Sequence, residues 1–428
     1  VLGGDHPLYF AANNGREPFF IYLVTLSVGL FGRTVLALRL PAALIGTLTI
    51  PATYWLGREL FTRRIGLLAA AIMTVTLWPV HLSHIGLRAV SLPLFSALWI
   101  ALGLRAYRSN RRRDWIIAGV VYGASFYTYL ASRFTPFALI LFSIGLLISR
   151  RSHRVWPNVI FFAAAAAVVV TPLAITAVNQ WDVVMGRPGD ISIFNSNINH
   201  GDLIGTAANS TLKAMGMFFW QGDSIPRHNV PDRPVFDPIL SIAFVIGLMG
   251  LIAALLPHSA RGQKNFFSAF SAMNKLASIF VLVWMAVMLL PTILAEDSPH
   301  FLRAVGVLPI AMLIPAIGLD LVGQWITRRA TPANRVTPGG PLPEGDGDRQ
   351  SANPMAARSR LIRSSFFSAV IILAGVFTLR DYSQYVIDPR TGYDFEVAGT
   401  ELAKVGQDAA AAHKQVFIAD RFLRDWAS

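Results

Sequence analysis

Long runs of apolar residues recur along the whole chain, separated by short polar and basic stretches. A membrane-spanning helix needs about 20 mostly apolar residues. Segments that reach or approach that length are 41–57, 65–82, 86–104, 115–131, 134–149, 157–178, 236–256, 275–294, 302–322 and 363–379. The pattern predicts an all-α multi-pass membrane protein.

Residues 18–32 are also apolar, but Gly29, Gly32 and Arg33 close the run early. A short apolar helix bounded in this way is typical of a helix that lies in the membrane interface rather than crosses the bilayer. We therefore assign it to a first outer loop, residues 1–40, which precedes the transmembrane core.

Composition supports the membrane class, because 54% of the residues are hydrophobic and only 14% are charged, against about 25% charged in soluble domains. The chain has no cysteine, which rules out disulfides and thiolate metal sites. It starts at Val1 without Met and stops at Ser428, just after a strand-like run. Both ends therefore look cut, and we expect a piece of a longer protein.

Basic residues gather in alternate loops. One set of loops holds more than half of the chain's 37 Lys and Arg residues, in the stretches 58–64, 105–113, 150–154, 261–275 and 328–363. The positive-inside rule places this set on the cytoplasmic side and both chain ends outside. The same rule accounts for the net charge of +13 better than nucleic-acid binding does.

These signals divide the chain into regions. The expected order is the first outer loop 1–40, a transmembrane core 41–322 with a long outer loop 179–235, a Pro- and Gly-rich cytoplasmic disordered linker 323–362, a last transmembrane helix 363–380, and the start of an extracytoplasmic α/β domain 381–428. The last region is expected to contain an amphipathic helix near 396–412 and a strand at 415–419.

Polar residues collect at the predicted outer ends of the spans. Arginine forks bind phosphate oxygens and a carboxylate accepts a proton, so this mixture predicts a pocket for an anionic, phosphate-linked substrate. The candidate substrate-binding residues are Arg16, His84, Arg88, Tyr129, Arg133, Arg227, His228, Asn229, His300 and Arg303, and the candidate catalytic residues are Glu17 and Asp5. Trp220, Asp223, Asp237, Glu296 and Asp297 are further polar or aromatic residues on this side.

Each candidate has a plainer interpretation. Arg88 and Arg133 are also explained as side chains that snorkel to the interface, and Glu17 as an acid favoured at a helix N-terminus. Tyr129 also fits an aromatic belt, and His84 an interfacial position. The histidines and acids show no regular ligand spacing, so no metal ligands are predicted, while a divalent cation stays an open alternative.

Several motifs together resemble one family. They are Arg16-Glu17-Pro18 followed by Ile21-Tyr22-Leu23, Arg39-Leu40-Pro41-Ala42-Ala43-Leu44, and Tyr54-Trp55-Leu56-Gly57-Arg58-Glu59-Leu60-Phe61. Their order over residues 10–150 resembles the polyprenyl-phosphate-dependent glycosyltransferases of the GT-C superfamily. The similar branch is the bacterial one of aminoarabinose transferases, protein mannosyltransferase-like enzymes and rhizobial lipopolysaccharide glycosyltransferases. The stretch Ser83–Arg88 is similar to the Ser-Arg-x-x-Arg stretch of that family, with His84 at the first arginine.

The resemblance implies a GT-C-like core that moves a sugar from a polyprenyl-phosphate donor to a lipid, glycan or protein acceptor. The site would lie on the outer face of the cytoplasmic membrane, with membrane lipids as partners and no nucleic acid. In that family an acidic residue, usually Asp, acts early in the first outer loop, and a Glu-Pro motif follows. Glu17 matches the later motif, and Asp5 is the only upstream carboxylate here. The family's aspartate is therefore expected before Val1.

Roles follow for three groups of residues. Arg88, Arg133 and Arg303 are expected to stabilise the departing lipid phosphate, because preorganised positive charge acts strongly where water is excluded. Glu17 is expected to orient the acceptor or a bound cation. The run Arg227-His228-Asn229 is expected to line or cover the donor cavity.

Two other functions stay open. A non-catalytic membrane subunit of cell-envelope polysaccharide assembly would share the topology without needing the acids and arginines. A secondary transporter would also have many spans, but it usually carries paired broken helices at the bilayer midplane. Here the polar residues gather at the outer edge instead, which argues against transport.

Overall fold

The fold comes from a computed structural model of the chain. Its described residues are 4, 6–11, 15–147, 152–182, 184, 189, 191–256, 275–330, 354–388 and a few positions between 391 and 412. The chain divides into two units, Val1–Thr378 and Leu379–Ser428. Of the second unit, the structure describes the end of one helix and a few helical positions. The predicted strand at 415–419 lies outside the described residues, as does most of the predicted helix at 396–412.

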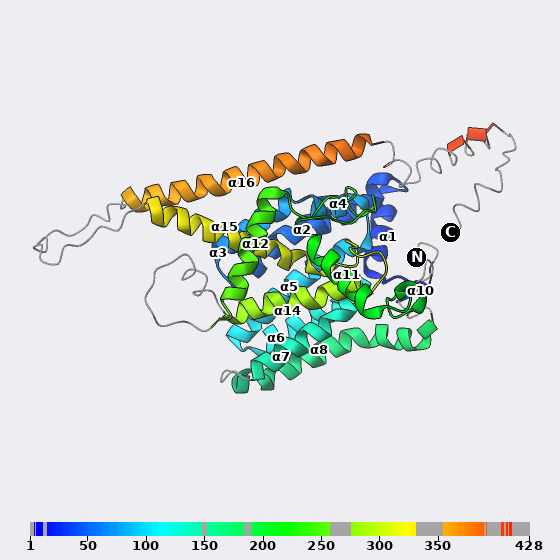
Figure 1. The fold of residues 1–428 in the computed structure, drawn as a ribbon. Coiled ribbons are helices and arrows are strands. Elements are labelled where there is room, and N and C mark those ends of the chain that lie inside the picture. Colours follow the sequence, from blue (N-terminus) through cyan, green and yellow to red (C-terminus); the bar gives the residue numbers. More distant parts are fainter. Residues whose placement is uncertain are drawn as a thin grey trace, which may run out of the picture. The chain divides into compact units, whose positions relative to one another are not determined.

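Helices make up nearly all of the ordered elements (Figure 1). They are α1 (Phe19–Phe31), α2 (Val35–Leu60), α3 (Arg63–Val75), α4 (Leu77–Ile85), α5 (Ser91–Ser109), α6 (Arg112–Ser125), α7 (Thr135–Leu147), α8 (Ser152–Asn179), α10 (Ser196–Asn199), α11 (Leu203–Gly216), α12 (Pro238–Ala253), α14 (Lys275–Ile293), α15 (Leu308–Ala330) and α16 (Pro354–Ile387). Three 3₁₀ turns complete the set: η1 (Arg88–Val90), η2 (Leu130–Phe134) and η3 (Val305–Val307). The described residues form no strand, only two isolated bridges.

The all-α multi-pass prediction is confirmed, but fewer segments are long enough to span than the sequence suggested. Within the described residues, six helices qualify by length and composition, at Val35–Leu60, Arg88–Ser109, Val155–Asn179, Lys275–Ile293, Val305–Thr327 and Ala357–Ile387. The pair α3 and α4, bent by 57°, makes a seventh if it counts as one span. The other three predicted spans form the shorter helices α6, α7 and α12, with 14, 13 and 16 residues.

The break between α3 and α4 has a local cause. Pro79 has no N–H with which to bond the carbonyl of Val75, and its ring crowds that carbonyl, so a continuous helix is disfavoured there. Thr76 accordingly adopts an extended backbone between the two helices. The freed Val75 carbonyl accepts a hydrogen bond of 2.6 Å from the Thr378 hydroxyl of α16. The predicted single span 65–82 is therefore two helices, and the second one turns toward η1.

The long outer loop predicted at 179–235 contains the two helices α10 and α11. It is tied to the segment after α14 by the isolated bridge between Ser192 and Ala295. The backbone hydrogen bonds Ile193 N to Leu294 O, at 3.1 Å, and Glu296 N to Ile191 O, at 2.9 Å, flank that bridge. Two segments about a hundred positions apart in sequence therefore form one wall of the molecule.

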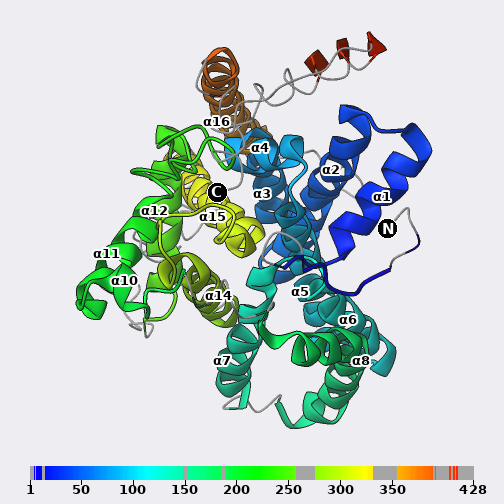
Figure 2. The same ribbon diagram turned by 90° about the vertical axis from the view of Figure 1, so that its right-hand side faces the viewer.

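Helix α2 separates two chemically different ends. It has 26 residues, or about 39 Å at 1.5 Å per residue, and it lies beside α1 (Figure 2). At its C-terminal end Glu59 pairs with Arg108 of α5, while Arg64 pairs with Asp320 of α15 at 3.1 Å. Two of the basic stretches predicted to be cytoplasmic, 58–64 and 105–113, thus form ion pairs at this end of α2, and the N-terminal end of α2 borders the cavity described below.

Helix α15 is the centre of the packing. Its apolar stretch is 94% buried, and it contacts α2, α3, α5, α12 and α14. It approaches α12 through two glycines. A Cβ on Gly318 would lie 1.9 Å from the carbonyl oxygen of Ala243, and one on Gly247 would lie 1.9 Å from that of Ile314. Small residues of this kind let membrane helices come close enough for backbone contact.

Replacing Gly318 by Val is expected to force α12 and α15 apart, because the clash is with backbone rather than with a movable side chain. We expect a loss of stability of about 1–3 kcal/mol or more, typical of overpacking, seen as a lower Tm in detergent micelles. Gly103→Ala in α5 is the matched control, since a Cβ at that position would meet no atom within 4 Å and alanine favours helix. Equal Tm values for the two variants would contradict the close crossing.

Candidate active site

A cavity of about 1190 Å³ lies beside the N-terminal end of α2. Its walls come from segments far apart in sequence: Tyr9 with residues 15–17, one face of α1, the first turn of α2, η1, η2, residues 191–194, residues 225–228 and the segment 291–303. Polar side chains gather at one part of this lining. The part along α1 and α2 is mostly apolar, with Ile21, Val24, Val28, Val35 and Leu38 beside the polar Thr25 and Arg39.

Three helices begin close to this cavity, each with a 3₁₀ turn in front of it. Arg88 starts η1 and leads into α5, Arg133 lies in η2 and leads into α7, and Arg303 precedes η3, which leads into α15. The first residues of a helix leave backbone N–H groups without helical partners and carry the positive end of the helix dipole. The cavity is therefore bordered by the 3₁₀ turns η1 and η2 in front of two helices, and by Arg303, which lies two residues before η3.

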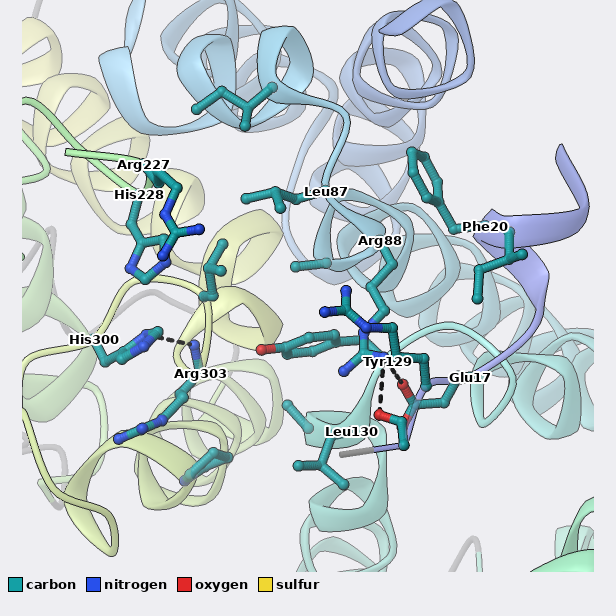
Figure 3. Close-up of a pocket in the computed structure, with 18 of the residues that line it drawn as sticks. Glu17, Phe20, Leu87, Arg88, Tyr129, Leu130, Arg227, His228, His300 and Arg303 are labelled. Carbon is teal, nitrogen blue, oxygen red and sulfur yellow. Dashed lines mark hydrogen bonds and ion pairs between the residues drawn. The ribbon is translucent and has the colours of Figure 1, made fainter. Parts of the chain in front are cut away.

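Glu17 occupies the centre of the positive wall, although its side chain is only 2% exposed. Its Oε2 lies 3.5 Å from Nη1 of Arg88, and its Oε1 lies 3.7 Å from Nη2 of Arg133. The carboxylate thus faces a guanidinium with each oxygen, and Figure 3 shows the contact with Arg88. A charged group this deeply buried is stable only with such partners.

The backbone before Glu17 is held by two features. Phe10 and Arg16 exchange hydrogen bonds of 3.0 and 2.7 Å in an isolated antiparallel bridge. Gly15 has φ +83°, and a Cβ there would lie 2.3 Å from the Tyr9 hydroxyl oxygen. The Gly15 carbonyl accepts a hydrogen bond from Nη1 of Arg88 at 3.3 Å. Glycine at this position therefore sets the place of both Glu17 and Arg88.

Arg88 and Arg133 each have a further partner. The Arg88 guanidinium lies 5.4 Å from the centroid of the Tyr129 ring, which is a cation–π distance. Arg133 donates to the carbonyl of Val184 at 3.4 Å. These contacts, together with a side-chain exposure of 19% for Arg88 and 31% for Arg133, do not fit free snorkelling into the interface.

The opposite wall carries Arg227, His228, His300 and Arg303, and the Tyr129 ring lies between the two walls (Figure 3). Arg303 donates from Nη1 to the carbonyl of Glu296. The imidazoles of His228 and His300 are tilted by 36° with centroids 4.5 Å apart. This wall is therefore built by two loops that touch through their histidines.

Asp223 lies behind these histidines and is 1% exposed. Its Oδ2 lies 3.1 Å from Nδ1 of His228 and 4.0 Å from Nδ1 of His300. The same oxygen accepts the backbone N–H of Phe301 at 2.7 Å, and Oδ1 accepts that of Ile225 at 2.8 Å. One carboxylate thus joins the loop before α12 to the loop before α15.

The charge states of this group follow from its surroundings. Burial alone would raise the pKa of Asp223, but the hydrogen bond and charge of His228, with His300 and the Ile225 N–H, bring it below the ordinary value. Burial lowers the pKa of His300 from 6.5 to about 3, and nearby Arg303 and His228 act in the same direction. At neutral pH the cluster therefore holds a carboxylate and a neutral His300.

Most of the candidate residues predicted from sequence line the cavity: Arg16, Glu17, Arg88, Tyr129, Arg227, His228, His300 and Arg303. Arg133 stands behind Glu17. His84 is outside the lining and contacts the Val80 carbonyl of its own helix. Asn229 is buried and donates to the carbonyls of Asp223 and Arg233, which gives it a role in shaping the loop. Asp5 lies outside the described residues.

Two residues of the site, Arg39 and Asp223, were not among the candidates predicted from the sequence. Arg39 lines the cavity, although the sequence presented it only as part of a motif at the start of a span. Asp223 was one polar residue in a long loop, and its contact with Phe301 joins positions 78 apart. No local spacing signals a contact of that kind.

Comparison with known proteins places this geometry in context. Residues 5–176 match the family described as dolichyl-phosphate-mannose-protein mannosyltransferase, and no curated protein matches the chain. The oligosaccharyltransferase of Archaeoglobus fulgidus, crystallised with Zn and sulfate, is similar with a TM-score of 0.50 and 15% identity, over 85% of this chain and 44% of that one. The present chain thus spans less than half the length of that protein.

Two further structures are similar in the same range. AglB from Archaeoglobus fulgidus, in complex with an inhibitory peptide and a dolichol-phosphate, has a TM-score of 0.49 and 15% identity, over 85% of this chain and 48% of that chain. ArnT from Cupriavidus metallidurans, bound to undecaprenyl phosphate, has a TM-score of 0.49 and 14% identity, over 94% and 71%.

The fold is that of an all-α multi-pass membrane protein, and residues 5–176 are similar to a family of glycosyltransferases. The match of residues 5–176 to a mannosyltransferase family agrees with the family resemblance of the motifs within residues 10–150.

Replacing Gly15 by Ala is expected to displace the segment that carries Glu17, because the new methyl group meets the Tyr9 ring and the backbone has positive φ. Gly32→Ala is the matched control, with φ +73° but no atom within 4 Å. Both variants carry the positive-φ penalty, of about 1 kcal/mol, so a larger fall in Tm for Gly15→Ala measures the Tyr9 contact. Equal shifts in Tm would show that the contact does not hold the segment.

Proposed function

We propose that this chain is the membrane part of a glycosyltransferase that moves a sugar from a polyprenyl-phosphate donor to a lipid, glycan or protein acceptor. The active site is placed at the cavity, on the outer face of the cytoplasmic membrane. The observation that carries the proposal is the meeting of Arg88 and Arg303, each next to the start of a helix, on a cavity with an apolar extension, with Arg133 behind Glu17. The family match supports the same class of lipid donor.

The positive end of the cavity suits a phosphate that gains charge as it leaves. In the proposed step the acceptor hydroxyl loses its proton, and its oxygen attacks the anomeric carbon. The bond between that carbon and the phosphate oxygen breaks, and the electron pair stays on the lipid phosphate. Helix N-termini and guanidinium groups that are already in place stabilise this charge without reorganising.

The apolar part of the cavity suits the polyprenyl chain. Ile21, Val24 and Val28 recur at helical spacing on one face of α1, and Val35 and Leu38 face them from the first turns of α2. A prenyl tail is apolar and a phosphate is anionic, so a ligand with both parts would match the cavity at both ends. This pairing favours a lipid-linked donor over a soluble nucleotide sugar.

Glu17 is proposed to position the two arginines of its wall. Each of its oxygens already faces a guanidinium, so it fixes the distance between Arg88 and Arg133. The first outer loop remains our proposed source of the proton acceptor, with Asp5 as the other carboxylate in it.

The alternatives fit less well. A transporter usually carries paired broken helices, whereas the described residues contain one bent pair, α3 with α4. A non-catalytic subunit gives no reason for a buried carboxylate between two arginines at the mouth of an apolar groove. Measured sugar transfer decides between that subunit and the enzyme.

Alanine at Arg88 or Arg303 is expected to lower kcat by about 10²–10³, the usual effect of removing one preorganised donor at a developing anion. The assay uses the full-length protein in lipid nanodiscs with a panel of undecaprenyl-phosphate-linked sugars and cell-envelope extract as the acceptor. Release of undecaprenyl phosphate is measured. Arg63→Ala, at the opposite end of α2, is the control and should retain wild-type turnover. Unchanged turnover in both cavity variants would refute the assignment.

Glu17→Gln is expected to reduce kcat by about tenfold or more while changing the donor KM less. The amide keeps the volume of the carboxylate but carries no charge, so it no longer fixes the distance between Arg88 and Arg133. Misplaced donors stabilise the transition state less well, which lowers kcat. Glu59→Gln is the matched control, because Glu59 also pairs with an arginine, Arg108, but outside the cavity. A kcat equal to that of the control would remove Glu17 from the site.

A further inference from the structure

Asp223, His228 and His300 form a compact cluster of three potential metal ligands. One ligand atom from each residue lies within 4.8 Å of the other two. The measured separations are 3.1 Å from Asp223 Oδ2 to His228 Nδ1 and 4.0 Å from the same oxygen to His300 Nδ1. Ligands at about 2.0–2.2 Å from a tetrahedral ion lie about 3.3 Å apart. An ion therefore fits between these atoms after shifts smaller than about 1 Å.

The donor chemistry matches a borderline divalent metal. Two imidazoles and one carboxylate form a common ligand set for Zn²⁺ with an open fourth position. Mg²⁺ and Ca²⁺ prefer oxygen ligands only, so this set selects against them. Both histidines also line the cavity, and the open position would face that space.

The carboxylate is oriented as metal ligands usually are. The backbone N–H of Phe301 binds Oδ2 and that of Ile225 binds Oδ1, at 2.7 and 2.8 Å. Such contacts with a ligand's oxygens fix its direction and add to metal affinity. The side chain of Asp223 is 2% exposed, and those of His228 and His300 are 10% and 12% exposed. The cluster is thus already shaped and nearly dry.

We propose that Asp223, His228 and His300 bind one Zn²⁺-class cation that joins the loop before α12 to the loop before α15. Arg227 and Arg303, which line the cavity, lie one and three residues from the histidine ligands. The ion would therefore fix the backbone from which both guanidiniums extend. This role concerns loop position, and it does not depend on the proposed transfer reaction.

The competing arrangement is a hydrogen-bonded pair without metal, in which His228 Nδ1–H donates to Asp223. That pair needs no partner from His300, whose Nδ1 is 4.0 Å from the carboxylate. A metal would use all three residues equally. The two arrangements therefore differ in what a change at His300 does.

The test is zinc binding to the purified chain in detergent. After treatment with EDTA and its removal, ZnCl₂ is titrated by calorimetry, and bound metal is counted by mass spectrometry after gel filtration. Wild type is expected to bind about one Zn²⁺ per chain. Changing a residue that only hydrogen-bonds to a metal ligand typically weakens metal binding 10–100-fold. We expect Asp223→Asn, His228→Gln and His300→Gln, which change the ligands themselves, each to weaken zinc binding by more than that. MgCl₂ at the same concentrations is expected to bind far more weakly.

His200→Asn is the matched control, because His200 is an exposed histidine in the long loop outside the cluster. It should bind zinc as the wild type does, and helical circular dichroism checks that each variant is folded. A zinc-dependent rise in Tm, present in wild type and the control but absent in His300→Gln, supports the bridge between loops. Binding that persists in all three cluster variants, or no binding by folded wild type, overturns the proposal whether or not the chain transfers sugar.

Discussion

The buried carboxylate of Glu17 is the contact on which the architecture of this site depends. It joins three segments that are distant in sequence. They are the segment held by the Phe10–Arg16 bridge, which carries Glu17, the turn η1 through Arg88, and the turn η2 through Arg133. Taking a carboxylate out of water costs several kcal/mol unless partners replace the lost hydration. Removing either arginine would leave that cost uncompensated in part. The segments are therefore held together by a charge that is tolerated only while they stay together.

The scaffold serves this contact by bringing helix starts to one place. Pro79 interrupts the helix that would otherwise continue from α3, and the resulting turn leads the chain through α4 to η1 and Arg88. The same bend exposes the Val75 carbonyl, which Thr378 of α16 satisfies. At the other end of α2, basic and acidic side chains pair across α2, α3, α5 and α15. A defect in helix geometry at one position is thus used to direct a charged residue into the cavity.

How much the sequence predicts depends on the range of the interaction. Apolar runs and charged loops are local patterns, and they predicted the all-α membrane class and the two chemically different ends. Helix lengths were overestimated where 3₁₀ turns replace expected helix, as at η2 before α7. The glycine crossing of α12 and α15 and the cluster around Asp223 arise from contacts across long separations. No periodicity along one segment encodes a partner that lies on another.

Charge balance gives the strongest reason to regard the cavity as a site for an anion. Its lining includes the arginines Arg16, Arg39, Arg88, Arg227 and Arg303 against the acids Glu17, Glu296 and Asp297. Glu17 also forms an ion pair with Arg133, which lies behind the lining. The helix starts at η1 and η2, which line the cavity, add further positive potential. A cavity that carries this excess beside an apolar groove is stabilised by a ligand that is anionic at one end and hydrocarbon at the other.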